Sequence, residues 1–166
     1  MATLLDLSTK KDSPLIKVDP GLEPSEQEWR AIYAGGRFQP WLINDLPNLV
    51  SEWQIEETPL QQLDALLEVF ASGEALTYGH RLNPLNHLGD GVWELKTADL
   101  RIFGWFPCKD HFIGVVADTA YRCKKHDLYA GYAGETVRFR DKLDLDQPKF
   151  IPGDDPHAVV SNLNYP

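Results

Sequence analysis

The sequence has little cysteine, no long apolar run and a shortage of positive charge. Its two cysteines, Cys108 and Cys123, are too few for a disulfide scaffold and match no zinc-site spacing, so we expect both to be reduced. No window approaches the roughly 20 apolar residues of a membrane span, and the amino terminus lacks the apolar core of a signal peptide. We therefore predict a cytoplasmic protein with no membrane contact, and we predict no metal or other cofactor.

Positive charge is scarce over the whole chain but not evenly so. Sixteen Lys and Arg stand against 25 Asp and Glu, a net charge of −9. This balance argues against nucleic-acid binding, because a polyanion is bound by clustered Lys and Arg. Between Val92 and Lys142, however, nine basic residues face seven acidic ones, so this segment carries +2 and the remainder −11. The sequence thus allows a cationic site on an otherwise acidic protein.

The length of 166 residues, 43% of them hydrophobic, predicts one structural domain with a single core. Within it we distinguish three regions: an amino-terminal arm (1–43) with one short strand at Leu15–Val18, an α+β core (44–142), and an acidic, proline-rich tail (143–166). The tail is expected to be extended, and its acidity suits it to cover a basic face. Twelve prolines agree with long irregular connections.

The centre of the chain reads as an antiparallel meander. Val92–Lys96, Leu100–Phe106 and Phe112–Ala117 are rich in Val, Ile, Phe and Trp, and turn residues separate them. Their aromatic side chains are predicted to lie in the core. Helices must then come from the flanking segments.

The strongest helix prediction is Pro59–Ser72. Thr58 suits the N-cap, Gln61 completes a capping box, and Gly73 ends the helix. Leucines at three- and four-residue spacing give it one apolar stripe for the core. Weaker patterns predict a helix over 25–34, an edge strand over 37–43, a helix over 44–54 and a helix from Asp127 to about Asp141.

A family resemblance lies in the order of these elements. The predicted helix leads into LGDGVWELKTADLRIFGWF (Leu88–Phe106), then a third strand, then Lys124-Lys125. This order resembles the RelE/ParE toxin superfamily, most closely its HigB-like, phage-derived branch, with its pattern GLWELR…YRIFY…KK. The resemblance covers about residues 58–142; Lys96 stands where the family has arginine, and Leu100 where it commonly has an aromatic residue.

The resemblance implies helices packed on a small twisted antiparallel sheet, here with an added amino-terminal region and an extended tail. It also implies a toxin of a toxin–antitoxin system that cleaves messenger RNA, in association with the ribosome and without a metal. An antitoxin protein and the mRNA–ribosome complex would be its partners. The oligomeric state, the RNA sequence preference and the existence of a cognate antitoxin stay open.

Lys96 and Arg101 are the residues that the resemblance places at the phosphate. RNA cleavage by transfer needs a base, an acid and cations aimed at the developing charge. The two residues flank a turn, so their side chains can converge there. The alternative is that both are ordinary surface charges, one of them paired with Glu94.

His126 completes the predicted catalytic set, because an imidazole can move a proton near neutral pH. Lys124, Lys125 and Arg122 would bind RNA phosphates, and Tyr129 would stack on a base. For each, the alternative is structural: a solvated histidine, a solvated basic turn, or a tyrosine packed in the core. His80, Arg81 and His87 lie on the loop before the meander, where they either line the rim of a site or form a polar connection.

Two other functions are open at this stage. One is a non-catalytic, phage-derived interaction module that keeps the same fold and uses its acidic arm and tail to bind a basic protein. The other is a ParE-like inhibitor of a protein target, because fold alone does not fix function.

Overall fold

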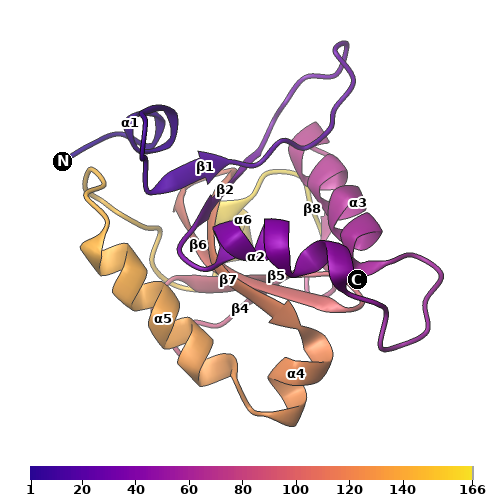
Figure 1. Cartoon of the computed structure of the whole chain (residues 1–166). Helices are drawn as coiled ribbons and strands as arrows, with labels where there is room; N and C mark the ends of the chain where they lie inside the picture. Colours follow the sequence, from indigo (N-terminus) through magenta and orange to yellow (C-terminus); the bar gives the residue numbers. More distant parts are fainter. Residues whose placement is uncertain (166) are drawn as a thin grey trace.

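A mixed six-stranded sheet forms the centre of the computed structural model, which describes residues 1–165 (Figure 1). Its strand order is β1-β2-β7-β6-β5-β4. The strands are β1 (Leu15–Lys17), β2 (Ala31–Gly35), β4 (Leu82–Pro84), β5 (Val92–Lys96), β6 (Leu100–Cys108) and β7 (His111–Thr119). A separate pair joins β3 (Leu76–Thr77) to β8 (Leu163–Asn164).

The predicted meander is confirmed. β5, β6 and β7 pair antiparallel in sequence order, with Lys96 opposite Arg101 and Arg101 opposite Asp118. The expectation of a purely antiparallel sheet is wrong, because β2 joins β7 in parallel, with Ile32 opposite Phe112. The α+β class holds, but residues from the region expected as an arm form two of the six strands.

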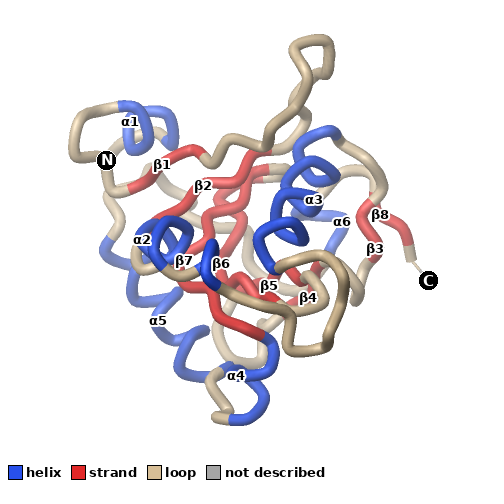
Figure 2. The backbone as a smooth tube through the Cα atoms, turned by 45° about the vertical axis from the view of Figure 1, so that its right-hand side comes forward, coloured by secondary structure: helices blue, strands red, loops and turns tan. Residues whose placement is uncertain are grey.

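Helices cover both faces of the sheet (Figures 1 and 2). They are α1 (Leu4–Thr9), α2 (Phe38–Asn44), the 3-10 turn η1 (Leu46–Asn48), α3 (Pro59–Ser72), α4 (Ala120–Lys125), α5 (Tyr129–Lys142) and α6 (Pro156–Val159). α2 and α3 bury their apolar sides against one face, where Trp93 and Ile102 lie. α5 covers the other face, where Phe103 and Trp105 lie. The predicted core aromatics Trp93, Phe103, Trp105 and Phe112 are fully buried.

The helix α3 forms as its sequence predicts. The Thr58 side chain accepts from the Gln61 N–H, the Gln61 side chain accepts from the Thr58 N–H, and Gly73 caps the end with a left-handed φ of 80°. Gln62 then ties the helix to the β5–β6 turn, since its Nε2 donates to Asp99 Oδ2 at 2.6 Å and its Oε1 accepts from Thr97 Oγ1 at 2.9 Å. α3 therefore fixes the turn that carries Lys96 and Arg101.

Three local predictions before α3 are wrong. Residues 31–35, expected to end a helix, form β2 instead, and the strand expected over 37–43 is the helix α2. Pro40 is tolerated there because it lies in the first turn, where backbone N–H groups have no partner within the helix. The helix expected over 44–54 is limited to η1. By contrast, β1 forms as predicted, and α5 extends to Lys142.

The tail runs back over the molecule and is packed rather than free. Of its predicted residues, 143–165 are described; Val159 and Val160 are each 1% exposed. Trp105 Nε1 donates to Lys149 O at 2.9 Å, and the Ile151 N–H donates to Phe106 O at 3.0 Å, so the tail is fastened along β6. Within residues 1–165, no helix is long and apolar enough to cross a membrane.

Candidate functional site

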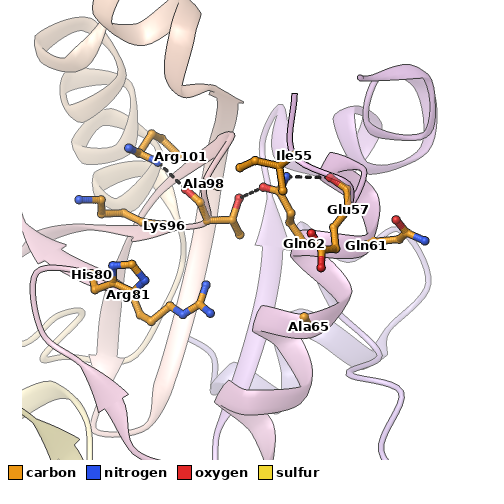
Figure 3. A pocket seen from close by; sticks show the side chains of 11 residues that line it. Ile55, Glu57, Gln61, Gln62, Ala65, His80, Arg81, Lys96, Ala98 and Arg101 are labelled. Carbon is orange, nitrogen blue, oxygen red and sulfur yellow. Dashed lines mark hydrogen bonds between the residues drawn. The ribbon is translucent and has the colours of Figure 1, made fainter. Parts of the chain in front are cut away.

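A pocket of about 440 Å³ lies between the β5–β6 turn and the amino-terminal end of α3 (Figure 3). One wall carries four basic side chains from the turn before β4 and from β5 and β6: His80, Arg81, Lys96 and Arg101. The opposite wall carries Glu57 and the amides of two glutamines. Because Glu57 is the single acidic lining residue, the pocket favours an anionic ligand.

Lys96 and Arg101 lie side by side in this pocket, as the turn between them predicts. They are register partners on adjacent strands, so their side chains project from the same face of the sheet. Arg101 is 7% exposed, and its Nη1 donates to the carbonyls of Thr97 and Leu100 at 2.7 and 2.8 Å. Lys96 is half-buried, with Nζ 3.1 Å from Gly79 O. Burial, followed by the charge of Arg101, lowers the pKa of Lys96.

Glu94, which sequence reasoning did not select, lies next to Lys96 and Arg101 but is not among the residues that line the pocket. It lies two positions before Lys96 on β5, so the two share a face, and it is 3% exposed. Within the described residues it forms no ion pair, and its Oε2 is buried without a hydrogen-bond partner. The alternative in which Glu94 pairs with Lys96 or Arg101 is therefore wrong for this structure.

Burial raises the pKa of Glu94, and the charges of Arg101, Lys96 and Lys124 oppose that rise. Tyr129 lies close to the same group: its ring meets Phe103 edge-on at 5.5 Å, and Phe103 is the register partner of Glu94. Burial raises the pKa of Tyr129 as well, with the negative charge of Glu94 adding to the rise. The charges of Lys96, Arg101 and Lys124 thus act on the pKa of Glu94, and the charge of Glu94 acts on that of Tyr129; these are four of the seven predicted site residues.

The other three predicted residues point elsewhere. Arg122 Nε pairs with Asp118 Oδ2 at 3.1 Å, and this hydrogen bond raises the Arg122 pKa. Lys125 lies over the ring of Tyr121 at 5.4 Å. His126 is the exposed C-cap of α4, whose backbone N–H donates to Arg122 O, and it does not line the pocket. The lysine pair ends α4 instead of opening a helix.

His80 and Arg81 do line the site, which selects one of the two readings that their position in the loop left open. The turn after β3 and the short strand β4 bring them beside β5, because Leu82 pairs with Leu95. His87 is exposed and outside the pocket. No sequence motif marks His80 or Arg81; only the pairing of β4 with β5 shows their place.

The acidic tail does not cover this pocket, although its composition suited it to do so. None of residues 143–165 is among the lining residues, because the tail is fastened to β6 and to the β3–β8 pair. Elsewhere in residues 1–165, no three His, Cys, Asp or Glu side chains gather closely enough to hold a metal ion.

Glu94 gives the stability of the protein a defined pH dependence. Because its folded-state pKa is raised, the folded chain binds more protons than the unfolded chain between the two pKa values, and stability falls as pH rises through that interval. Glu94→Gln is therefore expected to be more stable than the wild type at pH 7, with the difference closing near pH 4. Urea unfolding at both pH values measures this. The exposed control Glu68→Gln is expected to change stability by less than about 0.5 kcal/mol at either pH. If Glu94→Gln differed from the wild type in stability by the same amount at pH 4 and pH 7, the raised pKa of Glu94 would be contradicted.

In comparisons with known proteins, no family model, no curated protein and no solved structure matches this chain.

Proposed function

We propose that this protein is a RelE-like toxin of the HigB-like type: a metal-independent endoribonuclease that cleaves messenger RNA on the ribosome. The observation that carries the proposal is the open pocket in which Lys96 and Arg101 lie side by side, with His80 and Arg81 on the same wall. Cations fixed by the fold can stabilise the charge that develops on a phosphate during transfer, without reorganising at the moment of reaction.

The resemblance and the geometry support the same residues. Lys96 follows Trp-Glu-Leu and Arg101 is the second residue of the next strand, the two positions at which the resemblance places the phosphate ligands. Arg101 is held by two carbonyl contacts, which orient its guanidinium, whereas Lys96 is held by one and is more exposed. In this proposal Arg101 is the fixed phosphate ligand and Lys96 the adjustable one.

The test is a comparison of wild type, Lys96→Ala, Arg101→Ala and the double variant, each expressed in cells under a regulated promoter. Wild type is expected to arrest growth and to cleave messenger RNA, both in cells and on ribosomes in vitro. Removing one well-placed charge-stabilising donor typically lowers the rate by about 10²–10³-fold, and we expect the double variant to lose at least that much.

The matched control is Lys10→Ala/Lys11→Ala, which removes the same charge from exposed positions outside the pocket. Circular dichroism melting of each variant separates loss of chemistry from loss of fold, a necessary step because Arg101 is buried. A folded wild type that neither arrests growth nor cleaves RNA would contradict the nuclease.

A protein-interaction module is the second candidate, and one surface favours it. Ile43, Val50 and Trp53 are 73%, 75% and 51% exposed. They lie on the segment from α2 to α3, which also carries Glu52, Glu56 and Glu57. Exposed apolar side chains among acidic ones suit a basic, amphipathic protein partner, and in the toxin proposal an antitoxin would be that partner.

A further inference from the structure

The pocket contains one charged residue that phosphate binding does not explain. Glu57 is the single carboxylate among the lining residues and stands opposite the basic wall, so it repels a phosphate instead of attracting it (Figure 3). Its side chain is exposed, and within residues 1–165 only its backbone carbonyl has a hydrogen-bond partner. Glu57 also precedes residues 58–142, which carry the family resemblance, so the resemblance gives it no function. A carboxylate that is accessible and unpartnered in the pocket is available to a ligand.

The backbone of Glu57 is held in place although its side chain is free. Gln62 Nε2 donates to Glu57 O at 3.1 Å and to Asp99 Oδ2 at 2.6 Å. Gln62 Oε1 accepts from Thr97 Oγ1 at 2.9 Å, and Thr97 directly follows Lys96 in the chain. One buried glutamine therefore connects the two walls of the pocket, and the fold fixes where the Glu57 backbone stands relative to the cations.

Two walls of opposite charge suit a ligand with an anionic end and a hydrogen-bond donor end. Arg81 is half-buried and its guanidinium has no partner within the described residues, while Lys96 Nζ contacts one carbonyl. Ile55 and Ala65 add apolar surface on the side of Glu57. The volume of about 440 Å³ lies within the range of small-molecule sites, about 300–1,000 Å³. A nucleotide has the matching parts: a phosphate, a flat base with two apolar faces, and a hydrogen-bonding edge.

Guanine is the base whose edge fits a carboxylate. An ionised carboxylate only accepts hydrogen bonds, through two oxygens, and guanine presents two adjacent donors, N1–H and the N2 amino group. Adenine and cytosine present an amino group beside an acceptor nitrogen, and uracil presents one N–H between two carbonyls, so each would set a lone pair against the carboxylate. We infer that Glu57 selects guanine, accepting from N1–H and N2–H while Arg81 and Lys96 bind the phosphate. The inference rests on the proposed function for its substrate, the RNA, and adds the base that the pocket reads.

The first experiment measures binding by NMR titration of the full chain with GMP, IMP, AMP, CMP and UMP at low salt and pH 7. Wild type is expected to bind GMP most tightly, with IMP weaker because it lacks the N2 amino group. Glu57→Gln is expected to weaken GMP binding by about 10–100-fold, the range for one lost bidentate pair. The same variant should leave AMP binding unchanged or slightly tighter, since it removes a negative charge near the phosphate.

The matched control is Glu56→Gln, which removes the same charge from the neighbouring exposed residue, outside the lining of this pocket. It is expected to change the affinity for every nucleotide by less than about twofold. If Glu57 only repelled phosphate, Glu57→Gln would tighten GMP and AMP binding equally, and the inference would be overturned. Wild type that binds GMP no more tightly than AMP would overturn it as well.

The second experiment maps the cleavage sites in a ribosome-bound messenger RNA. Wild type is expected to cut at guanines, and Glu57→Gln to cut there about 10–100-fold more slowly while cutting at other bases as before. Equal wild-type cleavage at all four bases would overturn guanine selection and leave the nuclease proposal standing. Selective GMP binding without any cleavage of RNA would contradict the nuclease and support Glu57 as the residue that selects guanine in a nucleotide site.

Discussion

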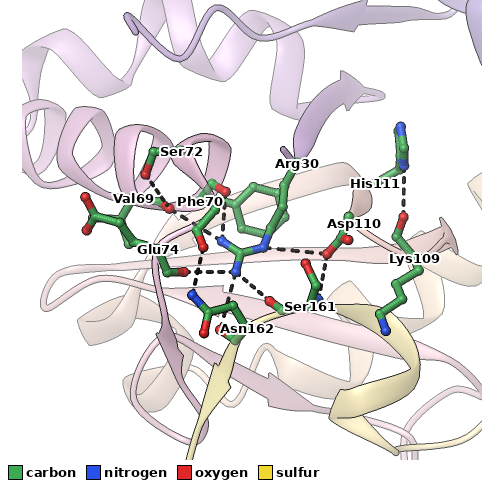
Figure 4. A network of polar contacts seen from close by, with 11 residues as sticks. Arg30, Val69, Phe70, Ser72, Glu74, Lys109, Asp110, His111, Ser161 and Asn162 are labelled. Carbon is green, nitrogen blue, oxygen red and sulfur yellow. Dashed lines mark hydrogen bonds and ion pairs between the residues drawn. The ribbon is translucent and has the colours of Figure 1, made fainter. Parts of the chain in front are cut away.

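Replacing Arg30 by methionine is expected to lower the free energy of unfolding by about 3–5 kcal/mol, because each buried carbonyl that loses its charged donor costs about 1–3 kcal/mol. Arg30 is 1% exposed and lies where the end of α3 meets the tail (Figure 4). Its Nη1 donates to Phe70 O at 2.8 Å, and its Nη2 donates to Glu74 O and Ser161 O at 2.9 and 2.6 Å. Methionine fills a similar volume but leaves these carbonyls without a donor.

Asp110 balances the charge of Arg30 only in part, so the backbone carbonyls are the main partners of the guanidinium. Nε lies 3.6 Å from Asp110 Oδ1, beyond hydrogen-bond distance, and burial lowers the Arg30 pKa against the influence of Asp110. The same Asp110 oxygen accepts from the Ser161 N–H at 2.7 Å. Loss of Arg30 should therefore release the tail first, because three segments far apart in sequence meet at this one side chain.

Urea unfolding and hydrogen exchange measure the Arg30→Met effect, with the fastest exchange expected in residues 155–165. The control is Arg37→Met, which removes a guanidinium bonded to Glu135 at 2.8 and 2.7 Å but 61% exposed; exposed pairs contribute about 0–1 kcal/mol. If both variants lost the same free energy of unfolding, burial would not be what makes the contacts of Arg30 stronger than those of Arg37.

The parts of the fold that the sequence predicts well are those fixed by neighbours along the chain. α3 has its cap, its apolar stripe and its terminating glycine within 16 residues, and β5, β6 and β7 follow each other with short turns. β2 could not be predicted in the same way. Its partner β7 begins 80 residues later, and the parallel pairing of Ala31 with His111 leaves no local pattern. The local pattern that predicts a helix over 25–34 is therefore misleading.

The same distinction applies to the site. Lys96 and Arg101 are close because a short turn joins their strands, and the sequence predicts this. The raised pKa of Glu94 depends on its burial, which β4, β6 and the amino-terminal end of α5 produce together. No local sequence pattern contains that information. His126 is the opposite case. Its residue type suits catalysis, but α4 ends at this residue and leaves it exposed.

Gly104→Ala is expected to prevent stable folding, with a loss of about 4 kcal/mol or more, a large share of the 5–15 kcal/mol that usually stabilises a domain. A Cβ at Gly104 would lie 2.0 Å from Ile113 O and 2.8 Å from the Ile113 carbonyl carbon. Both are backbone atoms of β7, so no side-chain rotation relieves the contact. Gly104 also adjoins an irregularity in the β6–β7 register, between Phe103 and Gly104. Adding one methyl group must therefore separate the two central strands.

Gly131→Ala is the matched control, since it adds the same methyl group where nothing lies within 4 Å. Gly131 is inside α5, and alanine is favoured over glycine in a helix by about 1 kcal/mol, so this variant is expected to be slightly more stable than the wild type. Thermal unfolding of both variants measures the difference. A well-folded Gly104→Ala would require β6 and β7 to be farther apart than they are here. The separation would also displace Arg101, because it belongs to β6 and is the register partner of Asp118 of β7.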